Sequence, residues 1–223
     1  MNFQSIIDRL SEAFSVFDFS YFISGSASLA ILAVFMWYNS LWPNIVIPHW
    51  MGIALLLIIV YVAGIVSMVL GKLLRLSMIR PKCIRSLFGI QDFDHIYTNS
   101  VETAASIHAL ECRELLNGDK KLLYTMMWSA LRNDEKYSKT VSFINKYWVT
   151  QALCEGLLVS CTLAVFTCWI TYFNDDRIQA LTCIYTTLLS ISSFMAFSYH
   201  ARRSAETQIR EVVVAYIQLK SAS

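Results

Sequence analysis

The sequence has little glycine and none of the motifs that mark common catalytic sites. Only seven of its 223 residues are glycine. Loops that bind phosphates or dinucleotides need several closely spaced glycines, whereas serine hydrolases and zinc proteases need GxSxG or HExxH motifs. None of these patterns occurs in the chain. We therefore expect no enzymatic activity and no bound cofactor.

Charged residues are also scarce, at 15% of the chain, while 56% of the residues are hydrophobic. The apolar residues collect in four long runs that hold almost no charge and are apolar on every side. About 20 apolar residues are needed for a helix to cross the hydrocarbon layer, and such a helix is not stable in water. The sequence predicts an all-α polytopic membrane protein with four transmembrane helices, at residues 21–38, 50–70, 148–173 and 178–199.

Positive charge is distributed unevenly around these runs. Of the 18 Lys and Arg residues, 17 lie in residues 1–20, 71–147 and 200–223, and the exception is Arg177. Because basic residues are retained in the cytoplasm, we predict an inner (plasma) membrane protein with both termini and the long middle segment cytoplasmic. The basic residues nearest to the runs are Lys72, Arg75, Arg80, Arg202 and Arg203. The net charge of +2 follows from this bias, so no direct nucleic-acid binding is expected.

The runs divide the chain into five segments. Residues 1–20 have apolar side chains at helical spacing and are expected to form an amphipathic helix, which lies either on the inner leaflet or on the protein. Residues 21–70 and 148–199 are two transmembrane hairpins. Residues 71–147 are too long for a connector and form a cytoplasmic helical region, and 200–223 form an amphipathic cytoplasmic tail.

Several local signals place helices in the cytoplasmic part. Asn99, with Glu102 three residues later, predicts a helix start, and Asp119 predicts another. No proline or glycine separates residues 134–147 from the third run, or the tail from the fourth. Both are therefore predicted to be long single helices that extend out of the membrane, the first of roughly 40 residues.

Small and hydroxyl side chains recur at helical spacing inside three of the runs. Such residues let helix backbones approach closely and can hydrogen-bond between helices. They serve packing either within one chain or between subunits of an oligomer. The residues are Ala63, Ser67 and Gly71 in the second run, Cys154, Cys161, Ala164 and Cys168 in the third, and Thr182, Thr186 and Ser190 in the fourth.

Glu155 is the single carboxylate inside the four runs. It lies about two helical turns from Trp148, so we expect it at the membrane interface, within reach of water and paired with Lys146 or Arg202. An ion or proton pathway usually needs more than one such group, which argues against a transporter.

The candidates for a metal site are two cysteines and two histidines of the middle segment: Cys83, His95, His108 and Cys112. His108 and Cys112 are four residues apart and face the same way on a helix, and the other two would complete a tetrahedral zinc site. The intervals are irregular and no CxxC pair is present, so we expect ordinary surface residues and no metal.

In its layout the chain resembles small multi-span membrane subunits of bacterial anti-phage defence systems, such as the membrane subunit of Kiwa. The resemblance consists of the Phe17–Phe22 segment before the first run, two very short outer loops, and Arg202-Arg203 leading into an amphipathic tail. It covers the whole chain as architecture and carries no functional residue over. It implies an oligomeric membrane sensor that works with a cytoplasmic effector, a class that includes nucleic-acid-binding proteins.

Two functions follow from these patterns. The first is an oligomeric interaction or sensor subunit that binds a cytoplasmic protein through residues 71–147 and the tail. The second is an oligomeric pore or ion channel opened by a signal, with the Thr182, Thr186 and Ser190 stripe along its polar path.

Overall fold

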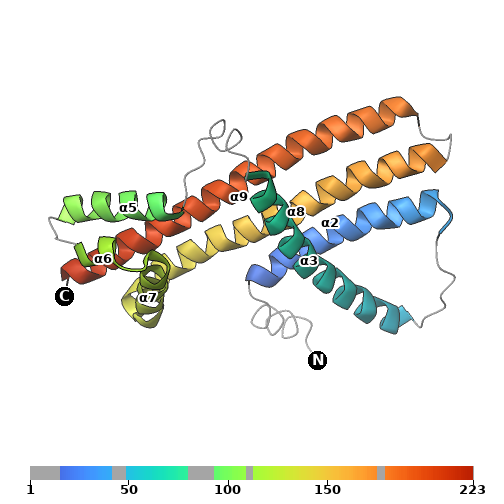
Figure 1. Ribbon diagram of the computed structural model, residues 1–223. Helices are drawn as coiled ribbons and strands as arrows, with labels where there is room; N and C mark the ends of the chain where they lie inside the picture. Colours follow the sequence, from blue (N-terminus) through green and yellow to red (C-terminus); the bar gives the residue numbers. More distant parts are fainter. Residues whose placement is uncertain (1–15, 42–48, 80–92, 109–112, 175–178, 223) are drawn as a thin grey trace. The chain divides into compact units, whose positions relative to one another are not determined.

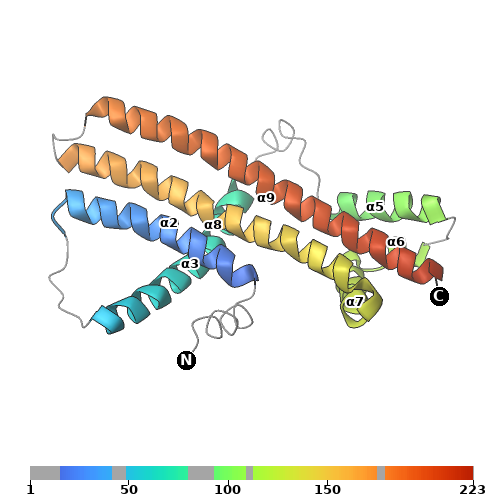
Figure 2. The same ribbon diagram turned by 180° about the vertical axis from the view of Figure 1, so that it is seen from behind.

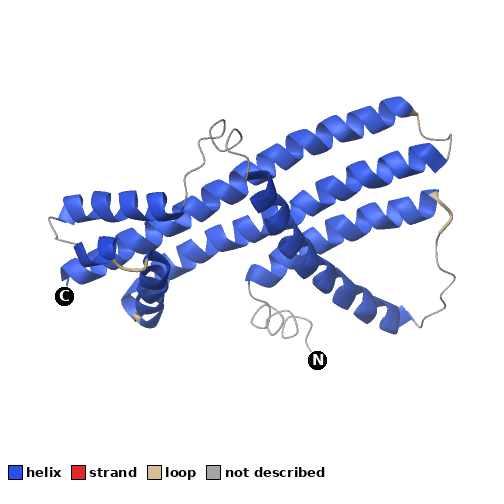
Figure 3. Cartoon of the chain, in the orientation of Figure 1, coloured by secondary structure: helices blue, strands red, loops and turns tan. Residues whose placement is uncertain are grey.

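The computed structural model describes residues 16–41, 49–79, 93–108, 113–174 and 179–222. Within these ranges every regular element is a helix, which confirms the predicted all-α class (Figure 3). The amphipathic helix predicted for residues 1–20 lies mostly outside the described residues. The elements are α2 (Val16–Tyr38), α3 (His49–Ile79), α5 (Phe93–His108), α6 (Arg113–Asn117), α7 (Lys120–Asn133), the 3₁₀ turn η1 (Glu135–Tyr137), α8 (Ser138–Asn174) and α9 (Ala180–Ala222).

Four of these helices are long and apolar enough to cross a membrane, as the four runs predict. The candidate spans are Asp18–Tyr38, Met51–Ser77, Glu135–Asn174 and Ala180–Ser221. The last two are longer than the predicted runs because α8 and α9 continue without a break into their amphipathic parts, with 37 and 43 residues. The prediction of two long single helices is therefore confirmed.

The chain forms two compact units. The first consists of residues 1–78 and 149–201, and the second of residues 79–148 and 202–223. Both α8 and α9 contribute residues to each unit. Within the first unit, α8 runs between α2 and α9, whereas α3 crosses α2 and α8 at an angle (Figure 1 and Figure 2).

The second unit has a hydrophobic core, which lies where the two long helices α8 and α9 meet the short helices. Tyr97 and Val101 of α5, Leu131 of α7, Ile144 of α8 and Val213 of α9 are completely buried together. Trp128 packs on Trp148, with ring centroids 4.9 Å apart. Because five helical segments supply this core, the second unit is a folded body and not a loose connector.

One of the two predicted helix starts is confirmed and the other is wrong. The carboxylate of Asp119 accepts hydrogen bonds from the backbone N–H groups of Lys121 and Leu122, so it caps α7. Asn99 lies in the middle of α5, which begins six residues earlier at Phe93. Its amide instead bonds to the ring of His95 one turn away, at 3.3 Å.

Candidate functional site

The first unit is held together by glycines at helix crossings. Gly25 of α2 and Gly64 of α3 lie where these helices cross, so that a Cβ added at Gly25 would overlap the carbonyl of Val60. A Cβ added at Gly64 would overlap the carbonyl of Tyr21. Only glycine allows two backbones to come this close. Sequence reasoning selected Ala63, which is half-buried, and missed both glycines.

Two more glycines bring α8 against α2 and α3. A Cβ at Gly71 would overlap the backbone carbonyl of Glu155, and one at Gly156 would overlap the side chain of Ser24. The neighbouring residues Glu155 and Gly156 therefore touch different helices. Of the small residues predicted to pack helices together, Gly71 lies at this contact, and Ser67 and Cys154 are also buried.

Serine side chains from three helices meet beside these glycines. The hydroxyl of Ser28 on α2 lies 3.0 Å from that of Ser67 on α3 and 2.9 Å from that of Ser160 on α8. Ser24, one turn before Ser28, donates to the carbonyl of Ser20. All five serines are buried, so the hydroxyls of Ser24, Ser28, Ser67 and Ser160 find their hydrogen-bond partners inside the protein.

The crossing of α3 and α8 also holds an ion pair. Nη2 of Arg75 lies 2.7 Å from Oε1 of Glu155, and Nε lies 3.0 Å from the same oxygen. Gln151, one turn away on α8, donates to this oxygen at 3.0 Å. The side chains of Arg75 and Glu155 are only 12% and 4% exposed. Two opposite charges are therefore removed from solvent at the point where the backbones of α3 and α8 touch.

This arrangement corrects two expectations about Glu155. The residue was expected at the water interface with Lys146 or Arg202, but it is buried and its partner is Arg75. The reason is the crossing geometry. Gly71 contacts the backbone of Glu155, and Arg75 lies one turn further along the same face of α3, so its guanidinium reaches the carboxylate. From the sequence, Arg75 is expected to act in membrane topology and not as the partner of Glu155.

A second carboxylate lies at the start of the first span. Tyr61 of α3 donates its hydroxyl to Oδ1 of Asp18 at 2.8 Å. The Tyr61 ring packs edge-on against Tyr21, with centroids 5.8 Å apart. Glu155 is the single carboxylate of the four predicted runs, whereas the longer candidate spans also include Asp18, Glu135, Glu206 and Glu211.

The hydroxyl stripe of α9 is divided between two grooves of the first unit. Thr182 and Thr186 line a groove of about 580 Å³ between α2, α8 and α9, together with Ala164 and Cys168. Ser190 lines another groove, of about 340 Å³, with Cys161. The three hydroxyls therefore do not face one common path within a single chain.

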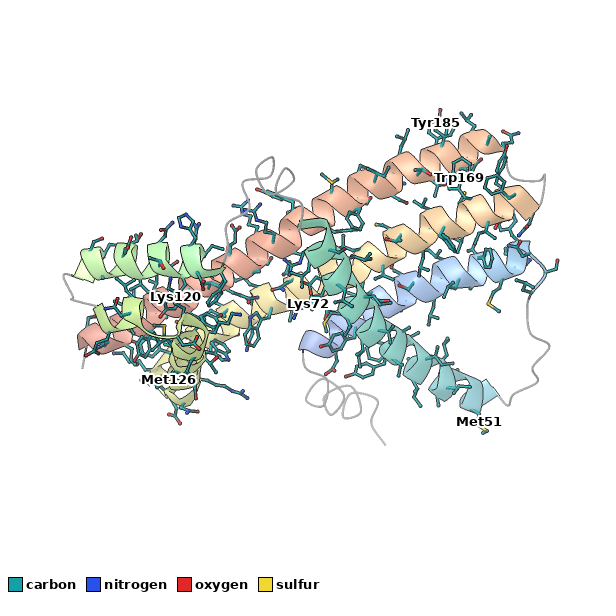
Figure 4. The ribbon with its side chains drawn as sticks, viewed as in Figure 1. Met51, Lys72, Lys120, Met126, Trp169 and Tyr185 are labelled. Carbon is teal, nitrogen blue, oxygen red and sulfur yellow. The ribbon has the colours of Figure 1, made fainter. Side chains whose placement is uncertain are left out.

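Next to the larger groove, α8 and α9 make side-chain contacts. Sγ of Cys168 lies 3.2 Å from Sγ of Cys183. Trp169 donates its indole N–H to the hydroxyl of Thr187 at 3.0 Å, and Figure 4 shows Trp169 between the two helices. These contacts fix the register of α8 against α9 near their shared loop.

The four metal candidates fall only partly on described residues. His95 is described and bonds to Asn99, whereas Cys83 and Cys112 lie outside the described residues, as does the side chain of His108. Among the residues that the structure describes, no three His, Cys, Asp or Glu side chains are grouped to hold a metal ion.

On the second unit, α7 presents an apolar surface to solvent. Its inner side buries Met127 and Leu131, while Leu122 and Met126, one turn apart, are 59% and 60% exposed. Figure 4 shows Met126 pointing away from the helices beside α7. We call these two side chains the Leu122–Met126 patch; other exposed apolar side chains of the second unit are Ile107 and Phe143.

Comparisons of the chain with protein families, with curated proteins and with solved structures each find no match. The resemblance to defence-system subunits stays a prediction.

Proposed function

We propose that this chain is an oligomeric inner-membrane sensor subunit that docks a soluble cytoplasmic protein on its second unit. The observation that carries the proposal is the Leu122–Met126 patch on α7, an exposed apolar pair on a body with its own core. Exposed apolar side chains grouped on a folded surface are typical of protein-binding sites, and methionine adapts to the shape of a partner.

The partner we propose is a soluble protein with an apolar groove or helix face. Lys121 and Thr125, which are exposed beside the patch on the same helix, would form a polar rim around it. A small apolar centre with a polar rim is the usual composition of an interface between soluble proteins. In the defence-system subunits that the chain resembles in layout, this partner corresponds to the cytoplasmic effector.

The long helices support a relay from the membrane to this surface. Both α8 and α9 run from the first unit into the second without an interruption. Glu155, whose pair with Arg75 ties α8 to α3, lies on one of them. A membrane disturbance that separates this pair would move α8 and change the surface offered to the partner.

Affinity purification in mild detergent from the native host, followed by mass spectrometry and a mass measurement of the complex, tests the proposal. We expect a soluble protein in stoichiometric amount and more than one copy of the chain. The double variant Leu122→Ser/Met126→Ser should lose the partner at least tenfold. Ile107→Ser, which removes another exposed apolar side chain of the same unit, should retain it. Full retention by the double variant would overturn the docking surface.

A pore is the alternative function. The polar residues Gln179, Thr182 and Thr186 gather along one groove near one end of the spans, which favours contact with water there. Because Ser190 lines the other groove, a continuous polar path would require several copies of the chain. A purified homo-oligomer with nothing bound, and with ion flux in liposomes, would support the pore.

A further inference from the structure

We propose that Cys168 and Cys183 are a redox-active dithiol that forms a reversible disulfide between α8 and α9. Their sulfurs are 3.2 Å apart, and the Cys183 thiol also approaches the backbone carbonyl of Cys168 at 3.5 Å. The sulfur–sulfur distance exceeds a disulfide bond of about 2.05 Å by only about 1.2 Å, which a small side-chain rotation can close.

The surrounding contacts hold the two thiols together. Trp169, which follows Cys168 on α8, donates its indole N–H to the hydroxyl of Thr187. That hydroxyl in turn donates to the backbone carbonyl of Cys183 at 2.7 Å. These two hydrogen bonds therefore hold the segments of α8 and α9 that carry the two cysteines next to each other. Oxidation requires no movement of one helix past the other, so the effective concentration of the two thiols is high.

The two sulfurs differ in access, which sets the order of the reaction. Cys183 is completely buried, whereas Cys168 is half-buried and lines the groove of about 580 Å³ between α2, α8 and α9. A small oxidant entering this groove meets Cys168 first. Cys183, behind it, is the resolving thiol.

The reaction is a thiol–disulfide exchange with a disulfide oxidant. The Cys168 thiolate attacks one sulfur of the oxidant, forms a mixed disulfide and releases the first leaving thiolate. The Cys183 sulfur, after losing its proton, then attacks Sγ of Cys168 and expels the second leaving thiolate. The protein loses two electrons and two protons, and the oxidant is reduced to two thiols.

The position along the helices suits this chemistry. Cys168 lies six residues before the end of α8, and Cys183 three residues after the start of α9, which correspond to about 9 Å and about 5 Å along the helix axes. The orientation in the proposed function puts these ends on the outer side, where disulfides persist. This compartment rests on the proposed orientation, whereas the reactivity of the pair does not.

The test uses the full-length protein with Cys83, Cys112, Cys154 and Cys161 changed to Ala, treated with one equivalent of 4,4′-dithiodipyridine. Each step of the exchange releases one thiopyridone, whose absorbance is measured. We expect release of two equivalents, no thiol left for a maleimide, and full recovery of both thiols with a reductant. Release of one equivalent with a stable pyridyl adduct would overturn the proposal, as would a disulfide between two chains.

Two controls separate this result from general thiol reactivity. A variant that retains only Cys154 and Cys161, seven residues apart on α8 and thus about 10 Å along its axis, should give adducts and no disulfide. Trypsin cleaves after Arg177, between the two cysteines, so the oxidised protein should yield one linked pair of peptides that a reductant separates. Separate peptides before reduction would contradict the bond.

Discussion

Glu155 and Arg75 neutralise each other inside the first unit. Each charge can be buried there only because the other is its partner. An unpaired charge at this depth would cost several kcal/mol in desolvation, because neither side chain has much access to solvent. Gln151 adds a third hydrogen bond to the carboxylate, so the pair acts as part of a small network.

Removing one partner should therefore be much worse than removing both. We expect Arg75→Met to destabilise the protein by about 3–5 kcal/mol, because Glu155 is left buried without its cation. The double variant Arg75→Met/Glu155→Leu should recover most of this loss. Thermal unfolding of the purified protein in detergent measures both, and a double variant no more stable than Arg75→Met would contradict the pairing.

Residue-scale features were the least predictable from the sequence. Glu155 was identified, but its partner was not, because the choice between Arg75, Lys146 and Arg202 depends on the angle at which α3 crosses α8. A signal was present: Gly71 and Arg75 are one turn apart, so a close backbone approach at the first places the second near the same neighbour. Ser20, Ser24 and Ser28, each four apart on α2, were a similar missed signal.

At the scale of elements, glycine in this chain marks helix contacts more than turns. Of the six glycines in the described residues, Gly25, Gly64, Gly71 and Gly156 lie against the backbone or side chain of another helix. Gly52, on α3 with Gly64 and Gly71, has open space around its Cβ position. The helix α3 thus carries both glycines that contact another helix and a glycine that contacts none.

This contrast gives a matched pair of substitutions on α3. Gly64→Ala should destabilise the protein by about 1–3 kcal/mol or separate α2 from α3, because the added methyl group overlaps the carbonyl of Tyr21. Gly52→Ala should be neutral or stabilising, since alanine favours helix formation by about 1 kcal/mol. Unfolding in detergent compares them, and equal effects of the two substitutions would argue against the crossing.

The helices themselves were predictable because length, hydropathy and uninterrupted periodicity determine them locally. The continuous α8 and α9 follow from the lack of glycine and proline at the membrane boundary. The start of α5 at Phe93 was missed because Asn99 and Glu102 imitate a capping pattern inside a helix. There, packing of Tyr97 and Val101 into the second unit's core outweighs the local signal.

At the scale of the whole molecule, orientation is the property that the charge distribution predicts. With the termini cytoplasmic, a cysteine introduced at Asp176, between α8 and α9, should react in intact cells with a membrane-impermeant maleimide. One introduced at Ser221, near the end of α9, should react only after the membrane is opened. A cysteine-free background makes the comparison direct. Labelling of Ser221→Cys in intact cells would show that the orientation is the opposite of the predicted one. The Cys168–Cys183 pair would then lie on the reducing, cytoplasmic side.

The ion pair also bears on which stimuli can act on the chain. A single charge displaced across a membrane gains about 2.3 kcal/mol for each 100 mV, which is how voltage drives gating. Arg75 and Glu155 carry opposite charges 2.7 Å apart, so the electric field pulls them in opposite directions and does almost no net work when they move together. A change in membrane potential therefore does almost no work on this pair when it moves as a unit, and acts on the crossing only by pulling the two charges apart.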